Sequence, residues 1–167
     1  PAILNSYQKK FDSLVLVKSA EDFGVIDSTK VYYIDGIVDM GSTSIEVPAT
    51  GINIVGSTFD VSQLVSSEDN YTMFTSPVGG SGNILRRNIG LTTSGINSQL
   101  QNLVGATGFE AIEDNIVNYN DCTSMGVIDN YRQGLETGTG RFGGTPELEL
   151  KGTWLGGYFI DTSIVRS

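Results

Sequence analysis

The chain has 167 residues, 39% of them hydrophobic and 17% charged, which is sufficient for one domain with a moderate core. Glycine is frequent, at 21 residues, and the charged fraction is below the usual quarter. This composition favours a turn-rich β protein and disfavours a helical bundle, which needs more Ala, Leu, Glu and Lys. The formal net charge of −9 argues against nucleic-acid binding, because phosphate contacts need clustered Lys and Arg.

The sequence contains no histidine, which excludes several common kinds of chemistry. Ser-His-Asp and Cys-His catalysis, His-ligated zinc and imidazole acid–base steps all need that side chain. The lone Cys122 cannot form an internal disulfide, and we expect it to be a small buried hydrophobic residue. The pairs Lys9-Lys10 and Arg86-Arg87 are expected to be ordinary solvated side chains. We expect no cofactor and no metal.

Residues 1–30 are expected to form an N-terminal capping segment. The apolar spacing from Ile3 to Val17 fits a short amphipathic helix, but Ser13–Val17 is equally compatible with a buried strand. Ser19–Phe23 places a serine before two acidic residues, which predicts one capped turn of helix. No stretch reaches the roughly 18 apolar residues of a membrane span, and the first residues lack the pattern of a signal peptide.

From residue 31 onward, short apolar runs recur between Gly, Asn, Asp and Ser, and many alternate apolar and polar residues as strands with one buried face do. The predicted strands are Val31–Ile34, Ser44–Val47, Gly51–Val55, Asn88–Leu91, Asn115–Tyr119, Gly126–Ile128, Glu147–Lys151 and Tyr158–Ile160. Between Val61 and Val104 the pattern is weaker and is compatible with helical turns or with strands joined by long excursions. Ser76–Gly82 and Thr137–Gly144 are predicted to be flexible loops.

Hairpin dipeptides are nearly absent, and Asp35-Gly36 is the one exception. Antiparallel sandwiches and barrels need tight reversals, whereas a parallel solenoid needs only bends, because each strand pairs with its counterpart one coil later. We therefore predict an all-β fold, a right-handed parallel β-helix over residues 31–167. Residues Ile160–Arg166 still have a strand pattern, so the C-terminal end of the solenoid is expected to be truncated or covered by a partner.

Several stretches follow one another with the cadence of β-helix coils: Asp35–Gly41, Ile45–Pro48, Gly51–Gly56, Asn115–Gly126 and Leu148–Trp154. Over about residues 31–165 the chain resembles pectate-lyase-like β-helices. In its neutral polar character it is similar to those of bacteriophage virion proteins such as tailspikes and appendages. The resemblance implies a virion or extracellular location and a non-enzymatic structural role as a tailspike or appendage segment or a capsid decoration. The implied partners are copies of the chain in a homotrimer, other virion proteins, and a host-cell polysaccharide.

The same family includes enzymes, so an extracellular polysaccharide lyase or glycoside hydrolase is the alternative. The densest mixture of acidic, basic and aromatic residues lies between Asp129 and Arg141. In the enzymatic interpretation, Asp129, Arg132 and Glu136 carry the reaction, and the guanidinium of Arg132 pairs with uronate carboxylates. An ion pair that steadies a corner is the structural interpretation of the same residues. No lyase motif is present in the chain.

A second set of residues is predicted to contact a glycan: Tyr131, Arg132, Trp154 and Tyr158. An aromatic ring beside glycine can present a flat face to a sugar, and it can equally fill a core or anchor an interface. Carboxylates also gather at Glu110, Glu113, Asp114 and Asp121. In this group, Glu110 and Asp114 would share one strand face, and this pair could serve glycoside hydrolysis or Ca²⁺ binding, with solvated charges as the third interpretation.

Overall fold

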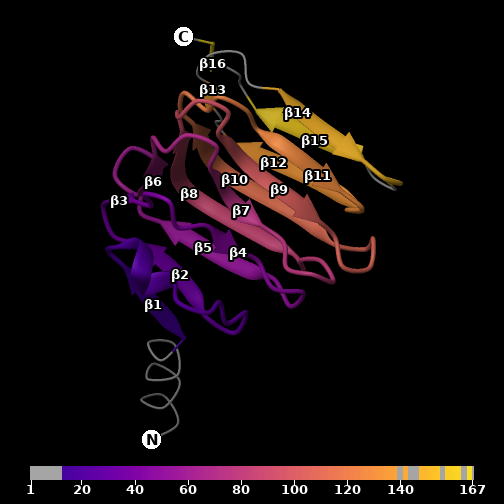
Figure 1. Ribbon diagram of the computed structural model, residues 1–167, viewed down its shortest axis with the longest axis horizontal. Coiled ribbons are helices and arrows are strands. Elements are labelled where there is room, and N and C mark those ends of the chain that lie inside the picture. The colour runs from indigo at the N-terminus through magenta and orange to yellow at the C-terminus, as the bar shows by residue number, and fades with distance from the viewer. Residues whose placement is uncertain (1–12, 139–140, 143–146, 155–156, 163–164, 167) are drawn as a thin grey trace, which may run out of the picture.

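The computed structural model describes residues 13–138, 141–142, 147–154, 157–162 and 165–166. Side chains are described for residues 13–137 and 147–154. Its strands pair in parallel throughout the described part of the chain, and successive coils stack from the N-terminal end to the C-terminal end (Figure 1). The prediction of an all-β parallel β-helix is confirmed. The described residues include no helix long and apolar enough to cross a bilayer.

The strands form three strips along the solenoid. The first strip contains β1 (Leu14–Val17), β2 (Val31–Ile34), β5 (Ile52–Gly56), the first parts of β8 (Ile84–Thr93) and β10 (Ala111–Tyr119), β12 (Gln133–Gly138) and β15 (Gly157–Thr162). The second strip contains β3 (Ile37–Asp39), β6 (Gln63–Ser66), the later parts of β8 and β10, β13 (Arg141–Phe142) and β16 (Val165–Arg166). The third strip is a separate sheet of β4 (Ile45–Glu46), β7 (Thr72–Thr75), β9 (Gln99–Val104), β11 (Gly126–Asp129) and β14 (Leu148–Lys151).

The coils differ in length, which explains why no clean repeat is visible in the sequence. Arg86 lies beside Asp114, 28 residues later, whereas Asn115 lies beside Thr137, 22 residues later. The strands keep register, so the difference is taken up in the connections between strips. The weak region from Val61 to Val104 contains β6, β7, β8 and β9, so it consists of strands with excursions and not of helical turns.

Corners of the coils use residues that tolerate left-handed backbone. Asn70 and Asn97 have φ of 55° and 56°, and the amide of Asn97 donates to the Asn70 side chain at 3.4 Å. Asn88 and Ile116 occupy equivalent places where β8 and β10 bend between the first and second strips, and both have φ of 55°. Asparagine accepts this conformation at low cost, whereas a β-branched residue is strained by it.

The core fills the space between the three strips with one inward-facing side chain from every second strand position. Ile54, Leu64 and Phe74, one from each strip, are all 0% exposed. Cys122 is also buried, as predicted. Gly126 shows how close the coils lie, because a Cβ at this position would stand 1.8 Å from the carbonyl oxygen of Gln101. Only glycine fits there.

The solenoid begins before residue 31. Strand β1 pairs in parallel with β2, which confirms the strand interpretation of Ser13–Val17 and makes Leu14–Val17 the first strand of the first strip. The preceding residues of the predicted amphipathic helix lie outside the described residues.

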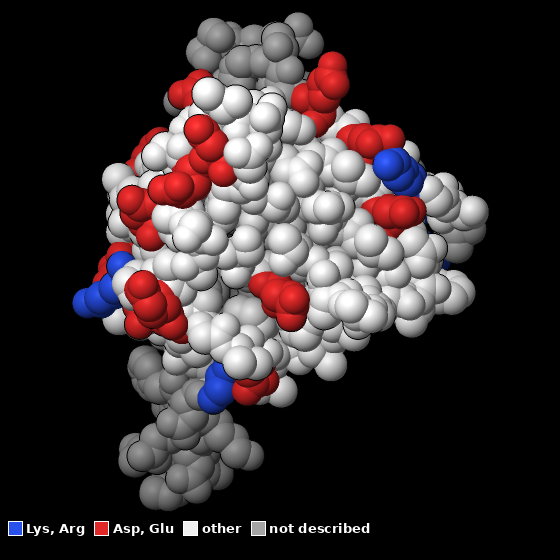
Figure 2. Space-filling model, viewed as in Figure 1, with Lys and Arg blue, Asp and Glu red and all other residues white. Residues whose placement is uncertain are grey.

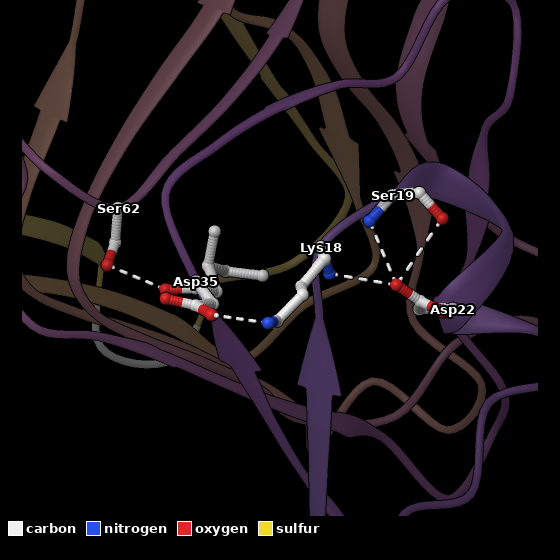
Figure 3. Close-up of polar contacts among 6 residues, drawn as sticks. Lys18, Ser19, Asp22, Asp35 and Ser62 are labelled. Carbon is white, nitrogen blue, oxygen red and sulfur yellow. Dashed lines mark hydrogen bonds and ion pairs between the residues drawn. The ribbon is translucent and has the colours of Figure 1, made fainter.

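A single 3₁₀ turn, η1 (Ala20–Phe23), follows β1, as predicted. The Asp22 carboxylate accepts hydrogen bonds from the backbone N–H groups of Lys18 at 2.8 Å and Ser19 at 2.9 Å (Figure 3). The Lys18 ammonium in turn pairs with Asp35 at 3.4 Å. The Phe23 ring stacks on Tyr32 with centroids 5.6 Å apart, which fixes this turn against the core.

The loop from Ser76 to Gly82, predicted to be flexible, is anchored near both of its ends. Ser81 is 0% exposed and its hydroxyl contacts those of Ser76, at 2.7 Å, and Tyr131, at 2.8 Å. Its backbone also bridges to Gly105 on the next coil. Half of the other predicted loop, Thr137–Gly144, lies outside the described residues, and its described residues belong to β12 and β13.

Candidate functional site

The residues of the enzymatic interpretation do not share one surface. Asp129 is half-buried at the end of β11 in the third strip, and Arg132 is exposed in the connection from β11 to β12. Glu136 on β12 is only 1% exposed, and its side chain is enclosed in the solenoid. An enclosed carboxylate cannot reach a polysaccharide, so these three residues do not form a solvent-facing acid–base site.

Tyr131 is likewise part of the interior. Its side chain is 0% exposed, and its hydroxyl donates to the carbonyl of Gly82 at 3.0 Å and contacts the hydroxyl of Ser81 at 2.8 Å. Burial raises the pKa of Tyr131 to about 12. The ring serves as a core plug, which is the structural alternative noted for the aromatic residues, and it is not available to stack on a sugar.

Trp154 is half-buried beyond the end of β14, where it packs against the core. Its indole N–H donates to the carbonyl of Lys151 at 2.8 Å, which fixes the ring beside the turn at Gly152. Part of the ring remains accessible to a ligand. The side chain of Tyr158, the other aromatic of the predicted glycan contact, lies outside the described side chains.

Glu110 anchors a turn. Its carboxylate accepts hydrogen bonds from the backbone N–H of Thr107 at 3.0 Å, of Gly108 at 2.9 Å and of Phe109 at 3.1 Å, and from the Thr107 hydroxyl at 2.7 Å. Burial acts to raise the pKa of Glu110, but these hydrogen bonds outweigh it and hold the pKa below its usual value. Asp114, its proposed partner, points into the core.

The remaining carboxylates of that group, Glu113 and Asp121, are exposed. Across the described residues, no three His, Cys, Asp or Glu side chains are placed so that they could hold a metal ion together. The pair of Glu110 and Asp114 therefore provides neither a calcium site nor a pair of carboxylates facing a sugar.

The described residues do bring one dense set of ionisable groups together, and it lies inside the solenoid. Arg86, on β8, is 0% exposed, and its Nε and Nη2 donate to the two carboxylate oxygens of Asp114 on β10 at 2.7 and 2.8 Å. Its Nη1 contacts the side-chain oxygen of Gln101 at 3.4 Å, and its guanidinium lies 5.1 Å from the centre of the Phe74 ring. The hydroxyl of Tyr119 also donates to Asp114. We call Arg86, Asp114, Tyr119 and Glu136 the interior charge cluster.

Glu136 extends this cluster by one coil. It lies in register with Asp114, and neither of its carboxylate oxygens has a hydrogen-bond partner in the described structure. Burial, reinforced by the negative charge of Asp114 and opposed by Arg86, raises the pKa of Glu136 to about 7. Near neutral pH this carboxyl group therefore exchanges between its neutral and charged forms inside the core.

The interior charge cluster continues an otherwise apolar column. Tyr32, Ile54, Arg86, Asp114 and Glu136 stand in register on five successive strands of the first strip, all facing inward. The expectation that Arg86 is an ordinary solvated side chain is wrong. The expectation is correct for its neighbour Arg87, which is exposed. Alternation along β8 sends one arginine inward and the next outward.

The third strip has an open polar groove on its outer surface. It is lined by Gln99, Ser124, Val127, Glu147 and Glu149, among others. Among the charged side chains visible in Figure 2, Asp and Glu predominate over Lys and Arg. This surface offers carboxylates and amides to solvent, but it has no enclosed acid–base pair.

The fold and the enclosed position of the interior charge cluster define a parallel β-helix protein whose ion pair at Arg86 and Asp114 is internal. Comparison of the chain with family models, with curated proteins and with solved structures found no match.

Proposed function

We propose that this chain is a non-enzymatic structural module that acts through protein contacts, as in a phage tailspike or appendage segment or a capsid decoration. The observation that carries the proposal is the enclosed position of the interior charge cluster. Arg86, Asp114 and Glu136 are each no more than 1% exposed, so the groups best suited to acid–base chemistry are enclosed in the core and do not face a substrate.

The remaining surface supports the same function. The stacked strips form continuous faces of the kind that β-solenoids use for contacts, and the exposed residues include large apolar side chains such as Leu14, Leu16, Ile37 and Phe109. Partners are copies of this chain or neighbouring virion proteins, and the resemblance noted in the sequence suggests a trimer. A host polysaccharide at the accessible part of Trp154 is the accompanying attachment role.

The test is to incubate the purified chain with acidic and neutral polysaccharides and to measure new reducing ends and unsaturated products. We expect no products, because the described surface lacks an assembled acid–base pair. Cleavage that is lost in the folded variant Arg132→Ala would support the lyase or hydrolase instead. A second measurement, mass spectrometry of virus particles purified from the source culture, should find the chain in the particle fraction.

A further inference from the structure

The outward face of the first strip carries apolar side chains on most of its strands, interspersed with the polar Asn53, Asn115 and Thr137. One outward column begins with Leu16, Tyr33 and Val55 on β1, β2 and β5. The next column includes Leu14, Leu85 and Leu135 on β1, β8 and β12. Leu14 and Leu16 are 42% and 48% exposed, and the other four side chains are partly exposed. We call these six residues the apolar stripe.

The third strip presents a different outward face. Its main outward column contains Glu46, Thr75, Asn102, Val127 and Glu149, in register across five strands. Only Val127 is apolar in this column. The same fold therefore exposes a polar face in one direction and a partly apolar face in another. A solvent-facing antiparallel or parallel sheet needs no such apolar face, and contiguous apolar patches mark contact surfaces.

Two opposite charges lie within the apolar stripe. Arg87, on β8, continues the column of Val55, and Glu113, on β10, stands between Leu85 and Leu135. Both side chains are exposed, and neither forms an ion pair with another described residue. Among the side chains described in these two columns, Arg87 and Glu113 are the charged ones and their charges balance, although the chain carries a net charge of −9.

This pattern favours a second copy of the chain as the occupant. A basic partner would be drawn to the acidic surfaces elsewhere, whereas two copies of an acidic protein repel each other except where charge is balanced. In a two-fold arrangement, residue i of one copy meets residue j of the other and the reverse contact forms as well. Arg87 and Glu113 lie on adjacent strands, so Arg87 of each copy can pair with Glu113 of the other copy.

We propose that the apolar stripe, with Arg87 and Glu113, is the surface through which two copies of this chain associate face to face. The inference rests on the proposed function, names its contact surface, and replaces the trimer suggested there by a pair of chains. From β1 to β12 the stripe is roughly 24 Å long, at about 4.8 Å per strand. Because the stripe is only two columns of side chains wide, its area is smaller than the roughly 800 Å² per partner of a standard interface, so the pair should dissociate on dilution.

The test is sedimentation velocity and light scattering of the full chain over a wide concentration range. We expect twice the mass of one chain at high concentration and the mass of one chain after dilution. Val55→Lys should weaken the association at least tenfold, because it places an ammonium in the stripe. The matched control is Val127→Lys, which changes the same residue type on the outward face of the third strip and should leave the association unchanged.

Charge variants test the pairing itself. R87E should weaken association by bringing carboxylates together, E113R should do the same with guanidinium groups, and the double variant R87E/E113R should restore it. Thermal unfolding of every variant separates lost contact from lost fold.

The inference is overturned if the wild-type chain has the mass of one chain throughout, or of three chains. It is also overturned if Val55→Lys and Val127→Lys behave alike, or if the unassociated chain binds neutral lipid vesicles through the stripe. An assembly that resists Val55→Lys would leave the proposed function standing, whereas polysaccharide cleavage would remove that function whatever the mass.

Discussion

Glu136 is an acidic residue in an enclosed, largely apolar position, where a charged form is unfavourable. Its carboxyl group is enclosed, lies in register with the Asp114 carboxylate and has no hydrogen-bond partner in the described structure. Such a group is tolerated more easily when it is neutral. The burial that raises its pKa to about 7 therefore makes the stability of the solenoid depend on pH.

Because the folded pKa of Glu136 exceeds its ordinary value of 4.5, the folded state holds this proton more tightly than the unfolded state. The favourable contribution is complete below about pH 4.5 and is lost as the pH rises through 7. We expect Glu136→Gln to be more stable than the wild type at pH 8, by on the order of 2 to 3 kcal/mol, and to differ little at pH 4. Urea unfolding at several pH values measures this difference. An equal effect at both pH values would show that Glu136 does not titrate in the core.

Removing one partner of the buried Arg86–Asp114 ion pair should destabilise the fold more than removing both partners together. Removing one partner leaves the other charge enclosed and uncompensated, so Asp114→Ala should lower the free energy of unfolding by about 3 to 5 kcal/mol. The double variant Arg86→Met with Asp114→Leu should lose much less, because it removes both charges and keeps apolar volume. The exposed Arg87→Met, measured at concentrations where the chain is unassociated, is the control and should change stability by less than about 0.5 kcal/mol. Equal losses for the single and double variants would contradict this account.

At the scale of elements, the bend between the first and second strips is strained at one of its corners. Asn88 on β8 and Ile116 on β10 share a left-handed conformation at equivalent positions. A left-handed conformation costs an ordinary L-residue about 1 to 2 kcal/mol. Since the Ile116 side chain is half-buried, Ile116→Asn gives up some apolar contact while relieving that strain.

We expect Ile116→Asn to raise the midpoint of thermal unfolding slightly, and the reverse change, Asn88→Ile, to lower it clearly. Differential scanning calorimetry of both variants provides the measurement. A stabilising Asn88→Ile would mean that the corner does not have the left-handed backbone described above.

The sequence predicts many of the strands and their parallel stacking. It does not predict which charged residues point inward and which point outward. Alternation predicted Val31–Ile34 and Gly51–Val55 as strands, and the missing hairpin dipeptides indicated parallel coils. In β12, however, Leu135 faces outward and Glu136 inward, which inverts the usual polarity. That choice is fixed by register with Asp114, and unequal coils of 28 and 22 residues hide the register in the sequence.

The sequence carries a signal for the buried ion pair in the residues that share a strand face with each charge. Ile84 and Arg86 share one face of β8, and Ile112 and Asp114 share one face of β10, so each charge follows an apolar residue on the same side. Aligning these two strands would have placed the arginine against the aspartate. The candidate catalytic group around Asp129 failed for the opposite reason, because closeness in sequence did not bring its side chains to one surface.

At the scale of the whole molecule, the enclosed ion pair and the apolar stripe both follow from one arrangement, in which each strand pairs in parallel with its counterpart on the next coil. The enclosed charges remove the best acid–base candidates from the surface, and the outward columns of the same strands supply a contact face. Neither feature would survive a different pairing of β8, β10 and β12, because one step in register exchanges inward and outward residues.

The most direct test is a backbone nuclear Overhauser measurement on the isotopically labelled chain at low concentration. Parallel coil stacking requires cross-strand contacts that link Leu85 to Glu113 and Glu113 to Leu135, and likewise Asn102 to Val127. We expect these contacts, together with an absence of close Hα–Hα contacts between strands adjacent in sequence. Strong Hα–Hα contacts joining such neighbours as antiparallel hairpins would contradict the coil arrangement, and with it the enclosed ion pair and the contact face.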